Sequence, residues 1–224
     1  MPSIYERALG ADFRRLHPKI QERFGFSSRD GVAAIGRGVM EEIRRPPSLT
    51  WPFLMLGLQR HIMFPEHGRD VPFRIENYAY VDNFGRETVT WNRRFEFEQT
   101  RCFDAQMVYS EERGRIVDYL GTHQHLAVDL DVRVTADGGI GFRSGEQRFY
   151  EGFVGFRFPG AFTGFADVVE RWDDEAGLYR IAVEVRNPVI GTIFGYRGRF
   201  ECGWIDAPAE LPVGVRPQRE EARI

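Results

Sequence analysis

Residues 72–97 read PFRIENYAYVDNFGRETVTWNRRFEF, and this stretch decides the fold. Aromatic and β-branched residues alternate with polar ones on both sides of the turn sequence DNFG at 82–85. A period of two is typical of strands with one buried face, and an acidic-Asn-Gly turn suits a hairpin. The stretch therefore predicts two antiparallel strands, at 73–81 and 87–97.

The same alternation continues toward the C-terminal end. It predicts further strands at 103–110, 115–120, 126–134, 140–150, 166–172, 179–185 and 194–204. Most connections are short turns, whereas the Gly- and Phe-rich connection 151–164 is long enough to be a functional loop at a barrel mouth. We expect an antiparallel β-meander that forms a barrel or a strongly curved sheet, lipocalin-like in architecture.

Helices are expected before the sheet. Ser3 and Glu6 have the spacing of a capping box and predict a helix that begins near Ser3. Val32, Ile35 and Val39 recur at helical intervals and predict a second helix over 31–45. The run WPFLMLGL at 51–58 predicts a short buried helix, with a cap over a cavity as the alternative.

These elements give an α+β fold with a single domain. We expect the domain to span 1–206, with a helical part at 1–65 and an antiparallel β part at 72–205, followed by a loosely ordered, Pro-containing tail at 207–224.

Composition excludes several classes of function. The 30 basic and 33 acidic residues are spread along the chain, which argues against a nucleic-acid partner. Cys102 and Cys202 lack the spacing of a zinc site or a disulfide framework, which indicates a reduced, cytoplasmic protein. The longest apolar run, at 51–58, is too short to span a membrane.

Polar residues that share a strand face with apolar ones are the candidate site, because burying them is costly unless they are paired or used. Arg93 alternates with Trp91, Asp118 lies between Ile116 and Leu120, and Asn77 follows Ile75. In the strand at 140–150, the face of Phe142 also carries Glu146, Arg148 and Tyr150. Inward arginines can bind a carboxylate or phosphate, while carboxylates orient them or move protons. A structural Arg–Glu pair that locks strand register inside a barrel is the alternative.

The histidines are a second group of candidates. His123 and His125 fall on one side of a strand with Asp129, a metal-like spacing. That side lies opposite the apolar face of the strand, and the other features of a cupin metal site are missing, so no metal is expected. We keep His123 and His125 as acid–base candidates, because imidazole titrates near neutral pH. His61 follows the apolar run and precedes the sheet, a position from which it can reach a barrel mouth.

Other signatures are absent from the sequence. It contains neither a dinucleotide fingerprint, nor a Walker phosphate loop, nor a nucleophile elbow. We therefore expect no cofactor.

Four blocks of sequence carry a resemblance: 3–10 (SIYERALG), 64–78, 115–121 (RIVDYLG) and 144–152 (SGEQRFYEG). Over residues 3–205 the chain resembles an uncharacterised bacterial family, a domain of unknown function found alone or fused behind saccharopine-dehydrogenase-like NAD(P)-binding domains. The fusions imply metabolism of small molecules, lipid-like ones among them. This chain lacks the nucleotide-binding part, so any redox partner would be a separate protein.

We therefore expect a barrel that holds an amphipathic small molecule, and binding alone or conversion by a cofactor-independent isomerase, cyclase or hydrolase both stay open. The acid–base candidates are Glu146, Asp118, His123 and His125, and the ligand-binding candidates are Arg93, Arg148, Tyr150, Asn77, Trp91 and His61. The alternatives are a protein–protein interaction module with a filled barrel that docks through 51–58, and metal-dependent catalysis at His123, His125 and Asp129. A homodimer is also left open.

Overall fold

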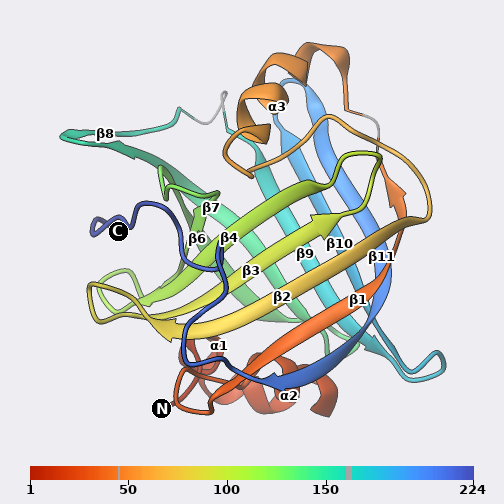
Figure 1. Ribbon diagram of the computed structural model, residues 1–224, viewed down its shortest axis with the longest axis vertical. Coiled ribbons are helices and arrows are strands. Elements are labelled where there is room, and N and C mark those ends of the chain that lie inside the picture. The colour runs from red at the N-terminus through yellow and green to blue at the C-terminus, as the bar shows by residue number, and fades with distance from the viewer. Residues whose placement is uncertain (45, 160–162) are drawn as a thin grey trace.

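The computed structural model describes residues 1–44, 46–159 and 163–224. Within them, ten antiparallel strands form a closed barrel (Figure 1). The strands around the ring are β6 (Leu126–Val134), β5 (Arg115–Leu120), β4 (Arg101–Ser110), β3 (Glu87–Phe95), β2 (Val71–Val81), β1 (Val32–Ile43), β11 (Gly191–Asp206), β10 (Leu178–Asn187), β9 (Phe165–Asp173) and β7 (Ile140–Glu151). Pairing of β6 with β7 closes the ring, and the short strand β8 (Val154–Arg157) extends β7 outside it.

The predicted barrel is confirmed, and all nine predicted strands are present within a few residues of the expected bounds. Strand β8 was not predicted and lies inside the long connection 151–164, whose residues 160–162 fall outside the described ones.

The helix predicted over 31–45 is wrong, because this segment forms strand β1. β1 pairs with β2 on one side and with β11 on the other. A Cβ atom on Gly38 would overlap the carbonyl oxygen of Arg199, so glycine is what allows the two strands to approach here. The helical part of the chain is therefore shorter than expected. Strand β1 takes the place of the expected helix and joins β2 to β11 in the barrel.

Helices fill one end of the barrel. Helix α1 (Ile4–Leu9) has the predicted capping box between Ser3 and Glu6, and α2 (Pro18–Phe24) follows after a 3-10 turn. Tyr5 of α1 and Phe24 of α2 pack against Phe142 of the barrel wall, with ring centroids 5.9 and 6.0 Å from it. These helices lie at the lower end of the barrel in Figure 1 and close it with a packed core.

Helix α3 (Trp51–Leu58) lies over the opposite end, at the top of Figure 1. The predicted helix is confirmed, but the expected burial is wrong. Leu54 is 1% exposed, whereas Trp51 is 49% and Leu56 68% exposed. Leu54 and the preceding Thr50 line a cavity, so the alternative of a cap over a cavity agrees with the structure.

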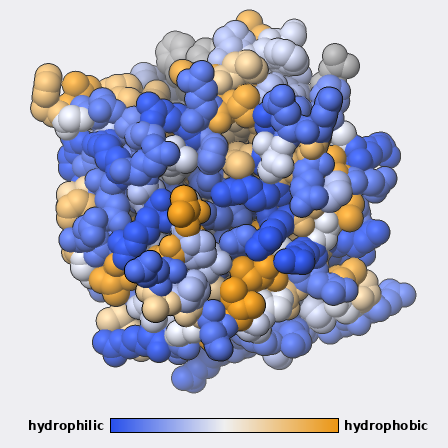
Figure 2. Space-filling model, viewed as in Figure 1, coloured by the Kyte–Doolittle hydropathy of each residue, from blue (hydrophilic) through white to orange (hydrophobic). Residues whose placement is uncertain are grey.

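The tail after β11, expected to be loosely ordered, runs along the outer wall of the barrel. Val215 is buried against Tyr78, and the hydroxyl of Tyr119 donates a hydrogen bond to the carbonyl of Arg223 at 2.6 Å. The face of the barrel in Figure 2 is mainly hydrophilic. No helix among the described residues is long and apolar enough to cross a bilayer.

Candidate functional site

Helices α1 and α2, which close one end of the barrel, are called the helical plug. A cavity of about 530 Å³ lies inside the barrel between the helical plug and α3. Trp91 and Phe142 form its inner end, and Thr50 and Leu54 lie at its outer end. Most of its wall is apolar, with Met107, Leu120, Val128, Val185 and Ile193 among the contributing side chains. The volume falls in the range of small-molecule sites, about 300–1,000 Å³.

Arg93 and Asp118 are the charged side chains of the cavity wall within the described residues. Arg93 points inward from β3, where the alternation predicted it. Its Nε donates to the carbonyl of Phe103 at 2.9 Å and its Nη1 to the hydroxyl of Tyr196 at 3.2 Å. The guanidinium carbon lies 3.8 Å from the centroid of the Phe103 ring. These contacts fix the side chain, and Nη2 makes no hydrogen bond with any described residue.

Asp118 points into the cavity from β5, also as predicted. Its Oδ1 is buried and has no hydrogen-bond partner among the described residues. Burial raises the pKa of the Asp118 carboxyl to about 7, and the positive charge of Arg93 acts in the opposite direction. Near neutral pH this carboxyl is therefore present in both its protonated and ionised forms, so it can donate or accept a proton.

The other polar groups of the wall hold the backbone at the outer end of the cavity. The Ser144 hydroxyl accepts a hydrogen bond from the Ala166 amide at 2.7 Å, and Gln147 donates to the carbonyl of Gly164. Asn187 donates through Nδ2 to the carbonyl of Thr163 at 2.8 Å.

Trp91 and Asn77 also point inward. Trp91 lines the cavity and donates from Nε1 to the Tyr5 hydroxyl at 2.9 Å. Asn77 lies deeper, near the helical plug, where its Nδ2 donates to the carbonyl of Thr90 at 2.8 Å. Asn77 does not line the cavity.

Glu146, Arg148 and Tyr150 do not point into the cavity, which corrects the expected inward face of β7. Val128 pairs with Gln147 and Leu130 with Ser144, so β7 has one more residue than β6 between these two pairs. Such a bulge interrupts the alternation, so the inward position passes from Ser144 to Gln147, and Arg148 and Tyr150 turn outward.

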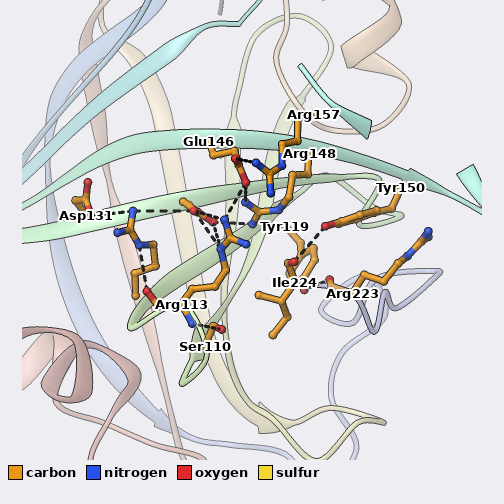
Figure 3. A network of polar contacts seen from close by, with 12 residues as sticks. Ser110, Arg113, Tyr119, Asp131, Glu146, Arg148, Tyr150, Arg157, Arg223 and Ile224 are labelled. Carbon is orange, nitrogen blue, oxygen red and sulfur yellow. Dashed lines mark hydrogen bonds and ion pairs between the residues drawn. The ribbon is translucent and has the colours of Figure 1, made fainter. Parts of the chain in front are cut away.

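On the outside of the barrel these residues join a network of charges (Figure 3). Arg148 contacts Asp129 at 2.6 Å and Glu146 at 2.8 Å, while Arg113 contacts Asp129 at 2.9 Å and Glu146 at 2.8 Å. Burial acts to raise the pKa of Asp129, but the hydrogen bonds from the two arginines outweigh it and lower the pKa. Arg148 and Glu146 are therefore paired, but on the outside of the barrel and on one strand, and the contacts that join β7 to other segments are Arg148–Asp129 and Arg113–Glu146.

Tyr150 contacts the tail rather than a cavity. Its hydroxyl donates to the carbonyl of Ile224 at 3.2 Å, and the guanidinium of Arg223 lies 4.5 Å from its ring centroid (Figure 3).

The three candidate histidines also lie outside the cavity. Nδ1 of His61 is 2.7 Å from Asp104, and Nε2 of His125 is 2.7 Å from Glu151. Nε2 of His123 lies 2.6 Å from Arg60. Burial lowers the pKa of His123, as does the charge of Arg60, so its imidazole is neutral at pH 7.

The described residues contain no group of three or more His, Cys, Asp or Glu side chains placed to hold a metal ion. In particular, Asp129 is bound to arginines rather than turned toward His123 and His125.

The sequence reasoning missed three polar residues of this region. Tyr196 could have been found, because it alternates with Phe194 and Phe200 on the inner face of a predicted strand. Gln147 follows an unpredicted bulge, and Asn187 lies just beyond the predicted end of its strand. Asn187 carried no signal, whereas Gly145 inside the strand was a sign of the bulge before Gln147.

Comparisons with known proteins give a family but no activity. The family described as "Domain of unknown function (DUF4166)" matches residues 16–200. A relative in Bacillus subtilis (strain 168), named "Uncharacterized protein YndH", is 33% identical over 202 residues, which cover 90% of this chain and 97% of the relative. No solved structure matches. The likeness to lipocalins and the fusion to dehydrogenase-like domains therefore stay predictions.

Proposed function

We propose that this chain, which belongs to the family of the domain of unknown function DUF4166, binds an amphipathic or lipid-like small molecule inside its barrel. The observation that carries the proposal is the apolar cavity of about 530 Å³ with two charged side chains, Arg93 and Asp118, in its wall. Ligand sites typically combine an apolar lining with a few polar groups that orient the ligand.

The polar end of the ligand would lie against Arg93. Nη2 of this arginine is left to donate a hydrogen bond, and the other two nitrogens are already held by Phe103 and Tyr196. A carboxylate or carbonyl oxygen is the natural acceptor for a guanidinium. A protonated Asp118 would donate a second hydrogen bond to the same head group. Among the described residues Arg93 is the arginine that lines the cavity, in place of the two arginines that the sequence predicted.

The test compares two neighbouring arginines on β3. Arg93→Met removes the inward charge, whereas Arg94→Met removes an outward one that contacts Asp104. Native mass spectrometry of the untagged protein would identify a co-purifying molecule. Binding to the cavity can also be titrated with the anionic hydrophobic probe anilinonaphthalene sulfonate, whether or not such a molecule is found. Loss of a hydrogen bond to a charged group should weaken binding about tenfold or more in Arg93→Met. Equal affinities of the two variants would contradict the proposal.

A second candidate function is catalysis by a cofactor-independent isomerase, cyclase or hydrolase in the same cavity. The observation in its favour is Asp118, a carboxyl with a pKa of about 7 at the wall of an apolar cavity. Perturbed groups of this kind are candidate general acids or bases. Once a ligand is identified, Asp118→Asn should retain binding and abolish its conversion. Binding alone is favoured if the purified protein leaves the ligand unchanged.

The cavity argues against the interaction-module alternative. That alternative predicts a filled barrel, whereas this barrel encloses a cavity.

A further inference from the structure

Exposed apolar side chains gather at the outer end of the barrel, around the cavity. They come from three separate segments: 48–58 at α3, 152–157 at β8, and the β10–β11 turn at 188–190. Representative members are Leu49, Trp51 and Leu56 of the first segment, Phe153 and Phe156 of the second, and Val189 of the third. Phe153 is 98% and Val189 77% exposed. In Figure 2 the apolar corner at the upper left corresponds to β8, beside a mainly hydrophilic wall. We call these three segments the mouth rim.

The mouth rim is continuous with the lining of the cavity. Thr50 and Leu54 of the first segment line the cavity, and so does Ile190 of the third. Phe158 lines it as well, and its ring packs 5.1 Å from that of Phe156 in β8. An apolar surface therefore leads from the interior of the barrel to the outside on several sides of the opening.

We propose that the mouth rim docks on the surface of a lipid bilayer, so that an apolar ligand passes between the membrane and the cavity without crossing water. This proposal rests on the proposed function. Protruding aromatic tips on separate segments suit insertion between lipid head groups, where Trp in particular is favoured. Exposed patches of this kind mark interaction sites, and the continuity with an apolar cavity selects lipid as the partner.

Charged side chains near the rim form ion pairs, in which Glu146 and Glu184 are each shared with further arginines. Arg157 contacts Glu146 at 3.0 Å, and Arg186 contacts Glu184 at 2.7 Å. We therefore expect docking to depend on the apolar side chains rather than on anionic lipid, and to persist at high salt.

The experiment measures flotation of the full chain with phosphatidylcholine vesicles. Leu56→Ser/Phe153→Ser removes two rim side chains that are 68% and 98% exposed, so the fold should tolerate it. The control Phe84→Ser/Val213→Ser removes exposed apolar surface elsewhere on the protein. We expect the wild type and the control to float, and the rim variant to bind vesicles at least about tenfold more weakly.

Three outcomes would overturn the docking proposal. The wild type fails to bind the vesicles, the rim variant binds as the wild type does, or the rim instead joins two copies in a dimer that the rim variant abolishes. The affinity for anilinonaphthalene sulfonate is measured in parallel in the wild type and in Arg93→Met. This measurement tests the ligand site separately from membrane docking. If the probe affinity depends on Arg93 but the wild type does not bind vesicles, only the docking proposal is wrong. If vesicle binding depends on the rim but the probe does not depend on Arg93, docking stands and the proposed ligand site fails.

Discussion

Replacing Asp118 with asparagine should stabilise the protein at neutral and alkaline pH. The carboxyl lies in the cavity wall, its Oδ1 has no partner among the described residues, and burial raises its pKa to about 7 against the charge of Arg93. A rise from the ordinary carboxyl pKa of about 3.9 to about 7 corresponds to about 4 kcal/mol of unfolding free energy. This single side chain is therefore expected to be among the most destabilising in the barrel.

The sign of the pH dependence follows from which state, folded or unfolded, releases the Asp118 proton at the lower pH. Below about pH 4 the folded and unfolded states both keep the proton, so Asp118 carries no penalty. Between about pH 4 and pH 7 the unfolded state alone ionises, and stability falls by about 1.4 kcal/mol per pH unit. Above pH 7 the full penalty is present. Asp118→Asn removes it, so its advantage over the wild type should grow with pH up to about 7 and then level off.

Urea unfolding followed by tryptophan fluorescence at a series of pH values measures this difference. Asp129→Asn is the matched control, because hydrogen bonds from Arg148 and Arg113 outweigh its burial and lower its pKa. Its stabilising contribution is fully present above about pH 5, so this variant should be less stable than the wild type by a constant amount from there upward. A constant difference for Asp118→Asn as well would show that its carboxylate is solvated or paired in the cavity, and would refute the reasoning.

Two further predictions concern the barrel wall. Arg148→Met should lower the unfolding free energy by about 3 kcal/mol, because Asp129 loses a buried partner. The same variant should bind anilinonaphthalene sulfonate in the cavity as tightly as the wild type does. A weaker probe affinity in the folded variant would mean that Arg148 does contribute to the ligand site, as the sequence predicted. Gly38→Ala should cost about 3 kcal/mol in chemical unfolding, whereas Gly203→Ala, with open space around its Cα, should cost little. Equal stabilities would mean that β1 and β11 can separate to admit a methyl group.

Regular alternation explains what the sequence predicted correctly. Arg93 and Asp118 lie on strands whose inner and outer faces alternate without interruption, so their inward direction could be predicted from their apolar neighbours. Glu146 lies within the bulge of β7 and Arg148 beyond it, where the alternation is reversed. Gly145 was the local sign of that irregularity, since a glycine inside a strand often marks a bulge.

Strand β1 was missed for a different reason. Its apolar residues fit a helical period as well as a strand, and only its pairing with β2 and β11 decides between them. Gly36 and Gly38 disfavour a helix but do not by themselves exclude one. In the barrel they are the positions where neighbouring side chains and backbone come close, which no short stretch of sequence reveals.

The pairing of β1 with β11 also has a consequence for folding kinetics. Val32 pairs with Asp206, so the ring cannot close until the last strand, β11, has formed and paired with the first, β1. Until then β1 has an open edge, which can pair with another chain. Closing a contact over such a separation costs loop entropy and slows folding. We therefore expect slow refolding, and expect the nascent chain to need protection from aggregation until β11 has emerged from the ribosome.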